Sequence, residues 1–225
     1  MLSRASAAFS RFAARALIDR SALPADVDAT GIGVWLAPHA HVVHYPVRQG
    51  RDINIVVIAK GDANAETWSS PIARDLVHDR VARFHPRLQR LVAAALIWRQ
   101  WPLVTRQPLP SYAQGLAALV GDAAHPTLPF LAQGAVMALE DAETLVAQLQ
   151  SHTAEPELAF SAYSARRHSR TQRLIAAASR NGRIYHLAGP LANARNLSLR
   201  VIPPSLIMRS YDWIYGKTDA PNDGK

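Results

Sequence analysis

The chain contains no cysteine, which excludes disulfide bonds, thiolate catalysis and zinc sites with cysteine ligands. Only Lys60, Lys217 and Lys225 are lysines, so the formal net charge of +8 comes almost entirely from arginine. No apolar run reaches the roughly 18 residues that a membrane-spanning helix needs. The 11 glycines are scattered, and none of them builds the Gly-x-Gly-x-x-Gly turn that holds a dinucleotide.

What is present is the composition of a globular protein, with 49% apolar and 19% charged residues in a chain of 225. A basic chain can bind nucleic acid or an acidic membrane. The charge can also reflect arginine-rich codon usage together with the lack of an acidic partner region. We favour the second explanation, expect neither nucleic acid nor membrane as a partner, and expect a cytoplasmic protein.

The most informative segment runs from Leu116 to Ala142. The apolar run Leu116–Val120 predicts a buried parallel strand that ends in a Gly-Asp turn. A proline-bearing loop follows, and residues 134–150 have the apolar stripe of a helix that packs on a sheet. This order places a carboxylate at a strand end and free N–H groups at a helix start. Both suit a polar, partly anionic ligand.

The remaining segments predict a sheet followed by helices. Alternating and β-branched residues predict an antiparallel meander. Prolines and the helical spacing of apolar residues indicate where the predicted helices begin. The predicted strands are 31–37, 41–47 and 53–59, with 96–105 extended, and the predicted helices are 71–84, 86–95, 157–179 and broken segments over 183–215.

Three stretches in order carry a resemblance to a known family: Gly121–Pro126, Leu128–Ala135 and Glu140–Ala142. Together they resemble the second flavin-binding motif of the class A FAD-dependent aromatic monooxygenases, the family of salicylate hydroxylase and 6-hydroxynicotinate monooxygenase. Other segments look like further parts of the same family, from about residue 9 to 216. Trp35–Arg48 looks like its substrate-domain strand pair, and Ser179–Leu187 and Tyr211–Gly216 look like its C-terminal helices.

The resemblance implies an α+β class and a partial p-hydroxybenzoate-hydroxylase-like fold. Its parts are an antiparallel or mixed substrate-domain sheet, the last strand and helix of the FAD domain, and C-terminal helices. Met1–Ala16 also has the composition of a mitochondrial transit peptide. We favour a family strand over 9–18. The expected divisions are a frayed start at 1–8, the sheet domain at 9–110, the FAD-domain part at 111–150, C-terminal helices at 151–216 and a disordered tail at 217–225.

The activity implied by the resemblance is hydroxylation of a phenolic or hydroxypyridine ring. In the family, NAD(P)H reduces FAD, and O2 adds to the flavin as a C4a-hydroperoxide that attacks the ring. Because the glycine-rich turn is missing, we expect a C-terminal portion, with the N-terminal domain lost or carried by a separate chain. We therefore expect weak FAD binding, or none, by the chain alone. An inactive remnant, a partner-dependent subunit and an arginine-rich nucleic-acid binder remain alternatives.

The family's flavin contacts fall on two stretches of this chain. Asp122 is expected to accept a hydrogen bond from a ribityl hydroxyl. The loop and helix start over 129–135 are expected under the pyrimidine edge, where they stabilise the negative charge of reduced flavin. His125 is expected to shape the loop. The predicted cofactor-binding residues are Gly121, Asp122, Pro129, Ala132, Gln133, Gly134 and Ala135.

The family's substrate contacts fall on the second strand of the predicted pair. His41 and Tyr45 share one face by strand alternation and are the predicted catalytic and substrate-binding residues, with His44 on the other face. A histidine that titrates near neutral pH can help to deprotonate a phenol; ordinary cross-strand packing explains these residues equally well. Arg106 either binds a substrate carboxylate or lies at the surface. With no acidic or cysteine partner near His39, we expect no metal.

An arginine row follows in the predicted long helix. No aromatic residues are interleaved with it, as they are in single-stranded nucleic-acid sites. We expect a solvated face, or a face that meets an absent domain, formed by Arg166, Arg167, Arg170, Arg173, Arg180 and Arg183.

Overall fold

The structure is a computed structural model that describes residues 6–61 and 68–216. The chain divides into two compact units, Met1–His186 and Leu187–Lys225, and each is described by itself. The strand that begins at Ser6 includes residues 6–8 of the expected frayed start. The rest of that start and the expected tail at 217–225 lie outside the described residues.

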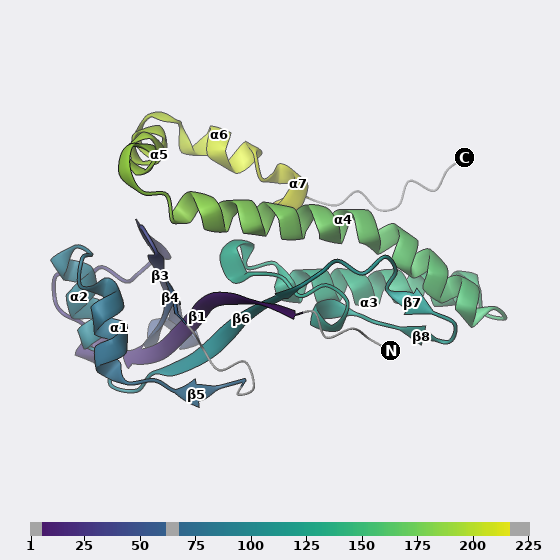
Figure 1. Ribbon diagram of the computed structural model, residues 1–225, viewed down its shortest axis with the longest axis horizontal. Helices are drawn as coiled ribbons and strands as arrows, with labels where there is room; N and C mark the ends of the chain where they lie inside the picture. Colours follow the sequence, from purple (N-terminus) through teal and green to yellow (C-terminus); the bar gives the residue numbers. More distant parts are fainter. Residues whose placement is uncertain (1–5, 62–67, 217–225) are drawn as a thin grey trace. The chain divides into compact units, whose positions relative to one another are not determined.

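The first unit is built on a six-stranded sheet in the order β2-β3-β4-β1-β6-β5, and every neighbouring pair in it is antiparallel (Figure 1). The sheet confirms the α+β class and the predicted meander. Its strands are β1 (Ser6–Asp19), β2 (Gly33–Ala37), β3 (Ala40–Val47), β4 (Asp52–Lys60), β5 (Ser70–Pro71) and β6 (Arg99–Arg106).

Two helices, α1 (Arg74–Val81) and α2 (Pro86–Ala93), cover one face of this sheet. Their buried Val77, Leu88 and Leu91 pack with alternate residues of β1, β3 and β4 in the main core. The helix predicted to begin at Pro71 begins three residues later. Pro71 instead pairs with Arg99 in the sheet, and the Ile72 N–H donates to the Trp98 carbonyl, which holds this segment extended.

The opposite face of the sheet is covered only in part. Ala13 and Ile58 pack there against Leu128 and Phe130 in a smaller apolar cluster. Farther along, Leu17 is 51% exposed. This face is therefore partly open, and the loop before the third helix closes one end of it.

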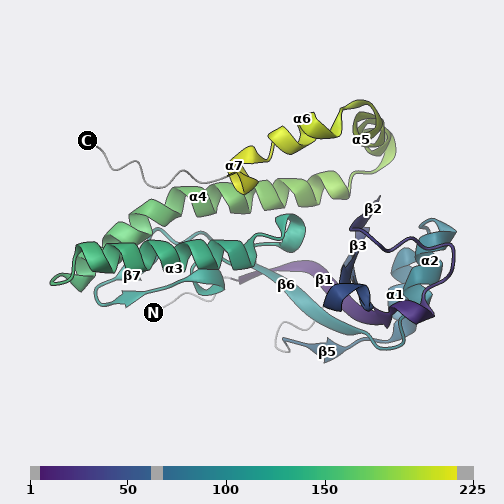
Figure 2. The ribbon, with the colours of Figure 1, turned by 180° about the vertical axis from the view of Figure 1, so that it is seen from behind.

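The third and fourth helices, α3 (Gly134–Ser151) and α4 (Pro156–Tyr185), pack against each other beside the sheet (Figure 2). A two-stranded ribbon of β7 (Ala113–Gln114) and β8 (Ala117–Ala118) contacts α4. The expected boundary at 150/151 falls inside the first unit, between these two packed helices. The 3-10 turns are η1 (Arg20–Ala22), η2 (Arg48–Gly50), η3 (Gly121–Ala123) and η4 (Pro129–Leu131).

Two predictions about this region are wrong. The run Leu116–Val120 is not a buried parallel strand: only two of its residues pair, antiparallel, and Leu116 is 71% exposed. The apolar stripe of α3 is exposed, with Leu139 at 71%, while Met137 and Asp141 are buried. The helix turns its polar side toward α4 because ion pairs join the two helices there.

The second unit contains three helices, α5 (Gly189–Val201), α6 (Pro204–Arg209) and α7 (Asp212–Tyr215). Prolines stand in the first turns of α5 and α6, where a missing N–H costs no intrahelical bond. Two of the broken segments expected over 183–215 thus begin at Gly189 and Pro204. Within residues 6–61 and 68–216, no helix is long and apolar enough to span a bilayer.

Gly182 is where α4 meets the loop that carries Phe130. A Cβ on Gly182 would lie 2.4 Å from Phe130 Cε2, so Gly182→Ala forces the ring aside. We expect it to lower the free energy of unfolding by about 1–3 kcal/mol in urea denaturation. Gly31→Ala is the matched control because its Cβ would meet nothing within 4 Å. Equal stability of the two variants would contradict the packing described here.

Candidate functional site

The Gly121-Asp122 turn requires a glycine. Gly121 has a φ of +57°, and its N–H donates to Asp141 Oδ2 at 2.8 Å. A Cβ there would approach Ala138 Cβ to 3.2 Å, closer than nearly all real contacts. The left-handed conformation and the close approach to α3 together aim the next residue away from the protein interior.

Asp122 is exposed and lies beside the start of α3. Its Oδ1 is 3.9 Å from the position that a Cβ on Gly134 would take. No side chain caps this helix at Gln133, and no acidic residue stands in its first turn. An open carboxylate therefore lies next to unpaired N–H groups at the positive end of a helix.

The loop over 129–135 alternates between exposed and buried residues. Pro129, Ala132 and Ala135 are exposed, and Ala132 has a φ of +53°, which is unusual for a residue other than glycine. Gln133 is buried, and its Oε1 has no hydrogen-bond partner among the described residues. A strained turn and an unpaired buried oxygen at one helix start are features of a ligand site.

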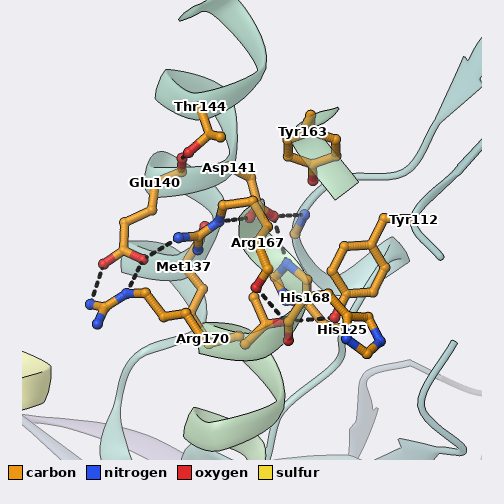
Figure 3. Close-up of polar contacts among 12 residues, drawn as sticks. Tyr112, His125, Met137, Glu140, Asp141, Thr144, Tyr163, Arg167, His168 and Arg170 are labelled. Carbon is orange, nitrogen blue, oxygen red and sulfur yellow. Dashed lines mark hydrogen bonds and ion pairs between the residues drawn. The ribbon is translucent and has the colours of Figure 1, made fainter. Parts of the chain in front are cut away.

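Beneath this surface, Asp141 forms the centre of a buried polar cluster (Figure 3). Its carboxylate is fully buried. Oδ2 accepts hydrogen bonds from the Gly121 N–H and, at 2.6 Å, from His125 Nε2. Oδ1 accepts one from Arg167 Nε at 2.7 Å. Asp141 thus connects α4 to the turn that presents Asp122.

The cluster continues through Glu140 on α3. Arg167 Nη1 lies 2.7 Å from Glu140 Oε2, and Arg170 binds both oxygens of the same carboxylate at 2.7 and 2.8 Å. Burial alone would raise the pKa values of Glu140 and Asp141. Hydrogen bonds from the neighbouring arginines, and from His125 in the case of Asp141, lower both pKa values below their ordinary range.

These contacts correct the interpretation of the arginine row. Arg167 is 5% exposed and Arg170 is half-buried, so neither belongs to a solvated face. The sequence did contain a signal for the pairing: adjacent acids on α3 match two arginines three residues apart on α4. The other members of the row, Arg166, Arg173, Arg180 and Arg183, are exposed.

The substrate residues predicted on β3 divide between the two faces of the sheet. His41 is buried with its ring 5.4 Å from that of Phe130 and 5.3 Å from that of Tyr185. Tyr45 is half-buried and shares the face of His41 by strand alternation. His44 packs on the opposite face, where Gly33 has no room for a Cβ beside its ring.

The sequence left open a His41 that titrates near neutral pH, and the burial of its ring opposes this. Burial lowers its pKa to about 3, and the neighbouring His186 and Arg11 add to the shift. The pKa of His186 is lowered to about 4, first by burial and then by Arg11. Both rings are therefore neutral at pH 7.

Arg106 lies close to the Asp122 turn. Its Nη2 donates to the Ala124 carbonyl at 3.2 Å, and its buried Nε has no partner among the described residues. The side chain is partly buried, so it is held at the turn. Within the described ranges, no group of three or more His, Asp or Glu residues is placed to hold a metal.

Residues 13–178 match the model of a family described as an FAD binding domain, and the chain belongs to this flavoprotein family. Its relatives place it among the class A FAD-dependent aromatic monooxygenases. The 3-hydroxybenzoate 6-hydroxylase of Klebsiella oxytoca is 35% identical over 202 residues, which are 90% of this chain and 51% of that protein. The 6-hydroxynicotinate 3-monooxygenase of Pseudomonas fluorescens is 33% identical over 145 residues, 62% and 37% of the two chains.

A salicylate hydroxylase solved as a substrate complex has the same fold. It superposes with a TM-score of 0.80 at 24% identity, over 95% of this chain and 56% of that chain. The chain spans about half the length of the curated relatives it matches first. The family and the fold class expected from the sequence are thus confirmed, and FAD is the cofactor of this family.

Acidification below about pH 6.5 is expected to destabilise the chain, down to about pH 4 for His186 and about pH 3 for His41. His41 and His186 have folded pKa values below 6.5, so the unfolded state binds more protons as the pH falls and stability is lost. Arg11 opposes the protonation of both rings in the fold, and His39 and Lys60 also oppose that of His186. Urea denaturation should show a loss of about 1 kcal/mol per pH unit, and a shallower slope for His41→Gln. A rise in the free energy of unfolding on acidification would contradict the lowered pKa values of His41 and His186.

Proposed function

We propose that this chain supplies the substrate-binding face and part of the flavin site of an FAD-dependent monooxygenase. The reaction is hydroxylation of a phenolic or hydroxypyridine ring with NAD(P)H and O2. The observation that carries the proposal is the open carboxylate of Asp122 beside the uncapped start of α3. The related enzymes act on hydroxybenzoates and on 6-hydroxynicotinate, as their names state.

The residues around α3 fit the polar end of FAD. Asp122 would accept a hydrogen bond from a ribityl hydroxyl, and the α3 start with Ala132 and Gly134 would face the pyrimidine edge. When bound, FAD supplies the redox chemistry that activates O2. This chain contributes preorganised N–H groups and a helix dipole, which favour negative charge at that edge.

The substrate ring would lie on the partly open face of the sheet, beside the rings that cover His41. His41 offers a neutral imidazole and Tyr45 a hydroxyl on this face, and Phe130 and Tyr185 provide aromatic walls. These groups orient a ring and its hydroxyl and keep water away from the reacting carbon. Arg106, held at the turn with an unpaired Nε, is the proposed contact for a substrate carboxylate.

A second candidate is a subunit that works only with a partner. The exposed stripe of α3 includes Leu139 at 71% and Val146 at 53%, and Leu116 between β7 and β8 is 71% exposed. An apolar surface of this kind marks a contact with another protein segment. We propose that it receives a flavin-domain half, equivalent to the part of the relatives that these 225 residues do not match. The nucleic-acid alternative loses support because Arg167 and Arg170 are paired within the fold.

A fusion tests the proposal. The half of the Klebsiella oxytoca relative outside the match is joined to this chain, and the purified fusion is titrated with FAD. It is then supplied with NADH or NADPH and a panel of hydroxybenzoates and hydroxypyridines. We expect a yellow protein that forms hydroxylated product, with the intact relative as positive control. A fusion that binds FAD and oxidises NAD(P)H but forms only hydrogen peroxide would overturn the proposal, whereas a colourless fusion would remove Asp122 from the flavin site.

A further inference from the structure

His41 belongs to a chain of hydrogen bonds that ends on the backbone of α4. Its Nδ1 lies 2.9 Å from His186 Nε2, and His186 Nδ1 lies 2.7 Å from the Gly182 carbonyl. His41 is 1% exposed and His186 is half-buried. The two histidines are 145 residues apart in the sequence and come from different elements.

The Gly182 carbonyl at the end of this series of hydrogen bonds determines which ring nitrogens of His186 and His41 carry a proton. A carbonyl only accepts, so His186 Nδ1 carries a proton and donates it to Gly182. In a neutral ring, His186 Nε2 then has a lone pair and accepts from His41 Nδ1–H. The proton of His41 is thereby held on Nδ1, and its Nε2 is left as an acceptor.

Arg11 favours the neutral form of both rings. Its Nη1 can only donate, and it lies 2.9 Å from His186 Nδ1 and 3.2 Å from Nε2. Because Nδ1 donates to the Gly182 carbonyl, the lone pair of Nε2 is the acceptor that remains for Arg11. The positive charge opposes protonation of His41 and His186, whose pKa values are lowered to about 3 and about 4. At neutral pH the Gly182 carbonyl favours the arrangement in which His186 Nδ1 and His41 Nδ1 carry the protons.

We propose that His186 is a positioning residue that holds His41 with an unprotonated Nε2, as a fixed hydrogen-bond acceptor for the ring hydroxyl of an aromatic substrate. The inference rests on the proposed function, which places the substrate on the face of His41. In this role His41 orients the hydroxyl. It is a poor proton acceptor at neutral pH, because a general base works best with a pKa near the working pH.

The tautomer is measurable in the full chain without flavin or substrate. Long-range 1H–15N correlation spectra of the histidine rings distinguish a protonated nitrogen from one with a lone pair. We expect His41 to show its proton on Nδ1 at neutral pH. A proton on Nε2, or a doubly protonated ring, would overturn the inference without any variant.

Two variants test whether His186 is the cause. His186→Phe removes the acceptor, and we expect the His41 signals to shift toward a mixture of tautomers. His186→Gln can retain an acceptor oxygen and should restore the wild-type pattern. His78→Phe, on α1 at the other face of the sheet, is the matched control and should leave His41 unchanged. An unchanged His41 tautomer in His186→Phe would overturn the inference.

Kinetics of the fusion separate this inference from the proposed function. With His186→Phe we expect KM for a phenolic substrate to rise about tenfold, with unchanged FAD affinity, because one hydrogen bond is misaligned. A fusion that binds FAD but hydroxylates nothing refutes the proposed function even if the tautomer is as expected. His186 would then only stabilise the fold, and its proposed role toward substrate would be refuted as well.

Discussion

Replacing Arg167 with methionine is expected to lower the free energy of unfolding by about 3–5 kcal/mol. Arg167 is 5% exposed and binds two carboxylates at 2.7 Å each. Removing its guanidinium leaves the fully buried Asp141 carboxylate without this positive partner. Removing one partner of a buried ion pair destabilises a protein more than replacing both partners. The loss is a large share of the total stability of an ordinary domain.

Urea denaturation at neutral pH measures this effect. Arg166→Met is the matched control, because Arg166 is the preceding residue of α4 and is exposed. We expect a change there of no more than about 0.5 kcal/mol. The double variant Arg167→Met with Asp141→Leu should recover part of the loss, because no charge is then left buried at this position. A loss in Arg167→Met that matches the Arg166 control would contradict the described cluster.

Replacing Asp122 with alanine is expected to weaken FAD binding by the fusion about 10–100-fold. A hydrogen bond to a charged group contributes about 1.5–3 kcal/mol, which corresponds to this range. Asp122 is exposed and forms no hydrogen bond or ion pair with the other described residues, so the substitution should leave the unfolding free energy of the chain almost unchanged. Loss of affinity without loss of stability is the signature of a ligand contact.

Isothermal titration with FAD measures the affinity of the variants. Glu143→Ala on α3 is the matched control, since it removes another exposed carboxylate from the same helix region. Asp122→Asn should lie between wild type and alanine, because the amide oxygen accepts without a charge. Equal affinities of the Asp122→Ala and Glu143→Ala fusions would remove Asp122 from the flavin site.

The elements that could be predicted from the sequence are those whose pattern is local. The β-branched runs of β3 and β4 and the proline at the start of α2 each determine their own conformation. The start of α1 was missed because Pro71 pairs with a strand that lies later in the chain. No local pattern contains that partner.

The motif predicted the candidate flavin-contacting residues, but the sequence did not predict the buried residues that hold them in place. The motif pointed to Asp122 and the start of α3, which the structure places side by side. The roles of Arg167 and His186 were missed because they depend on Asp141 and His41, 26 and 145 residues away. An arginine row on a helix resembles a solvated face until its partner carboxylates are known.

The environment of the apolar stripe of α3 also could not be predicted from the local sequence. Its spacing predicted a buried face, and within the described residues this face is exposed. A hydrophobic pattern indicates that a surface is built for burial, but it does not indicate which segment buries it. The stripe is consistent with the proposed contact to a flavin-domain half.

A crystal structure of the FAD-loaded fusion tests the central claim most directly. We expect the Asp122 carboxylate within about 3 Å of a ribityl hydroxyl, with the start of α3 facing the pyrimidine edge of the flavin. FAD bound with Asp122 and residues 132–135 both turned to solvent would contradict the account.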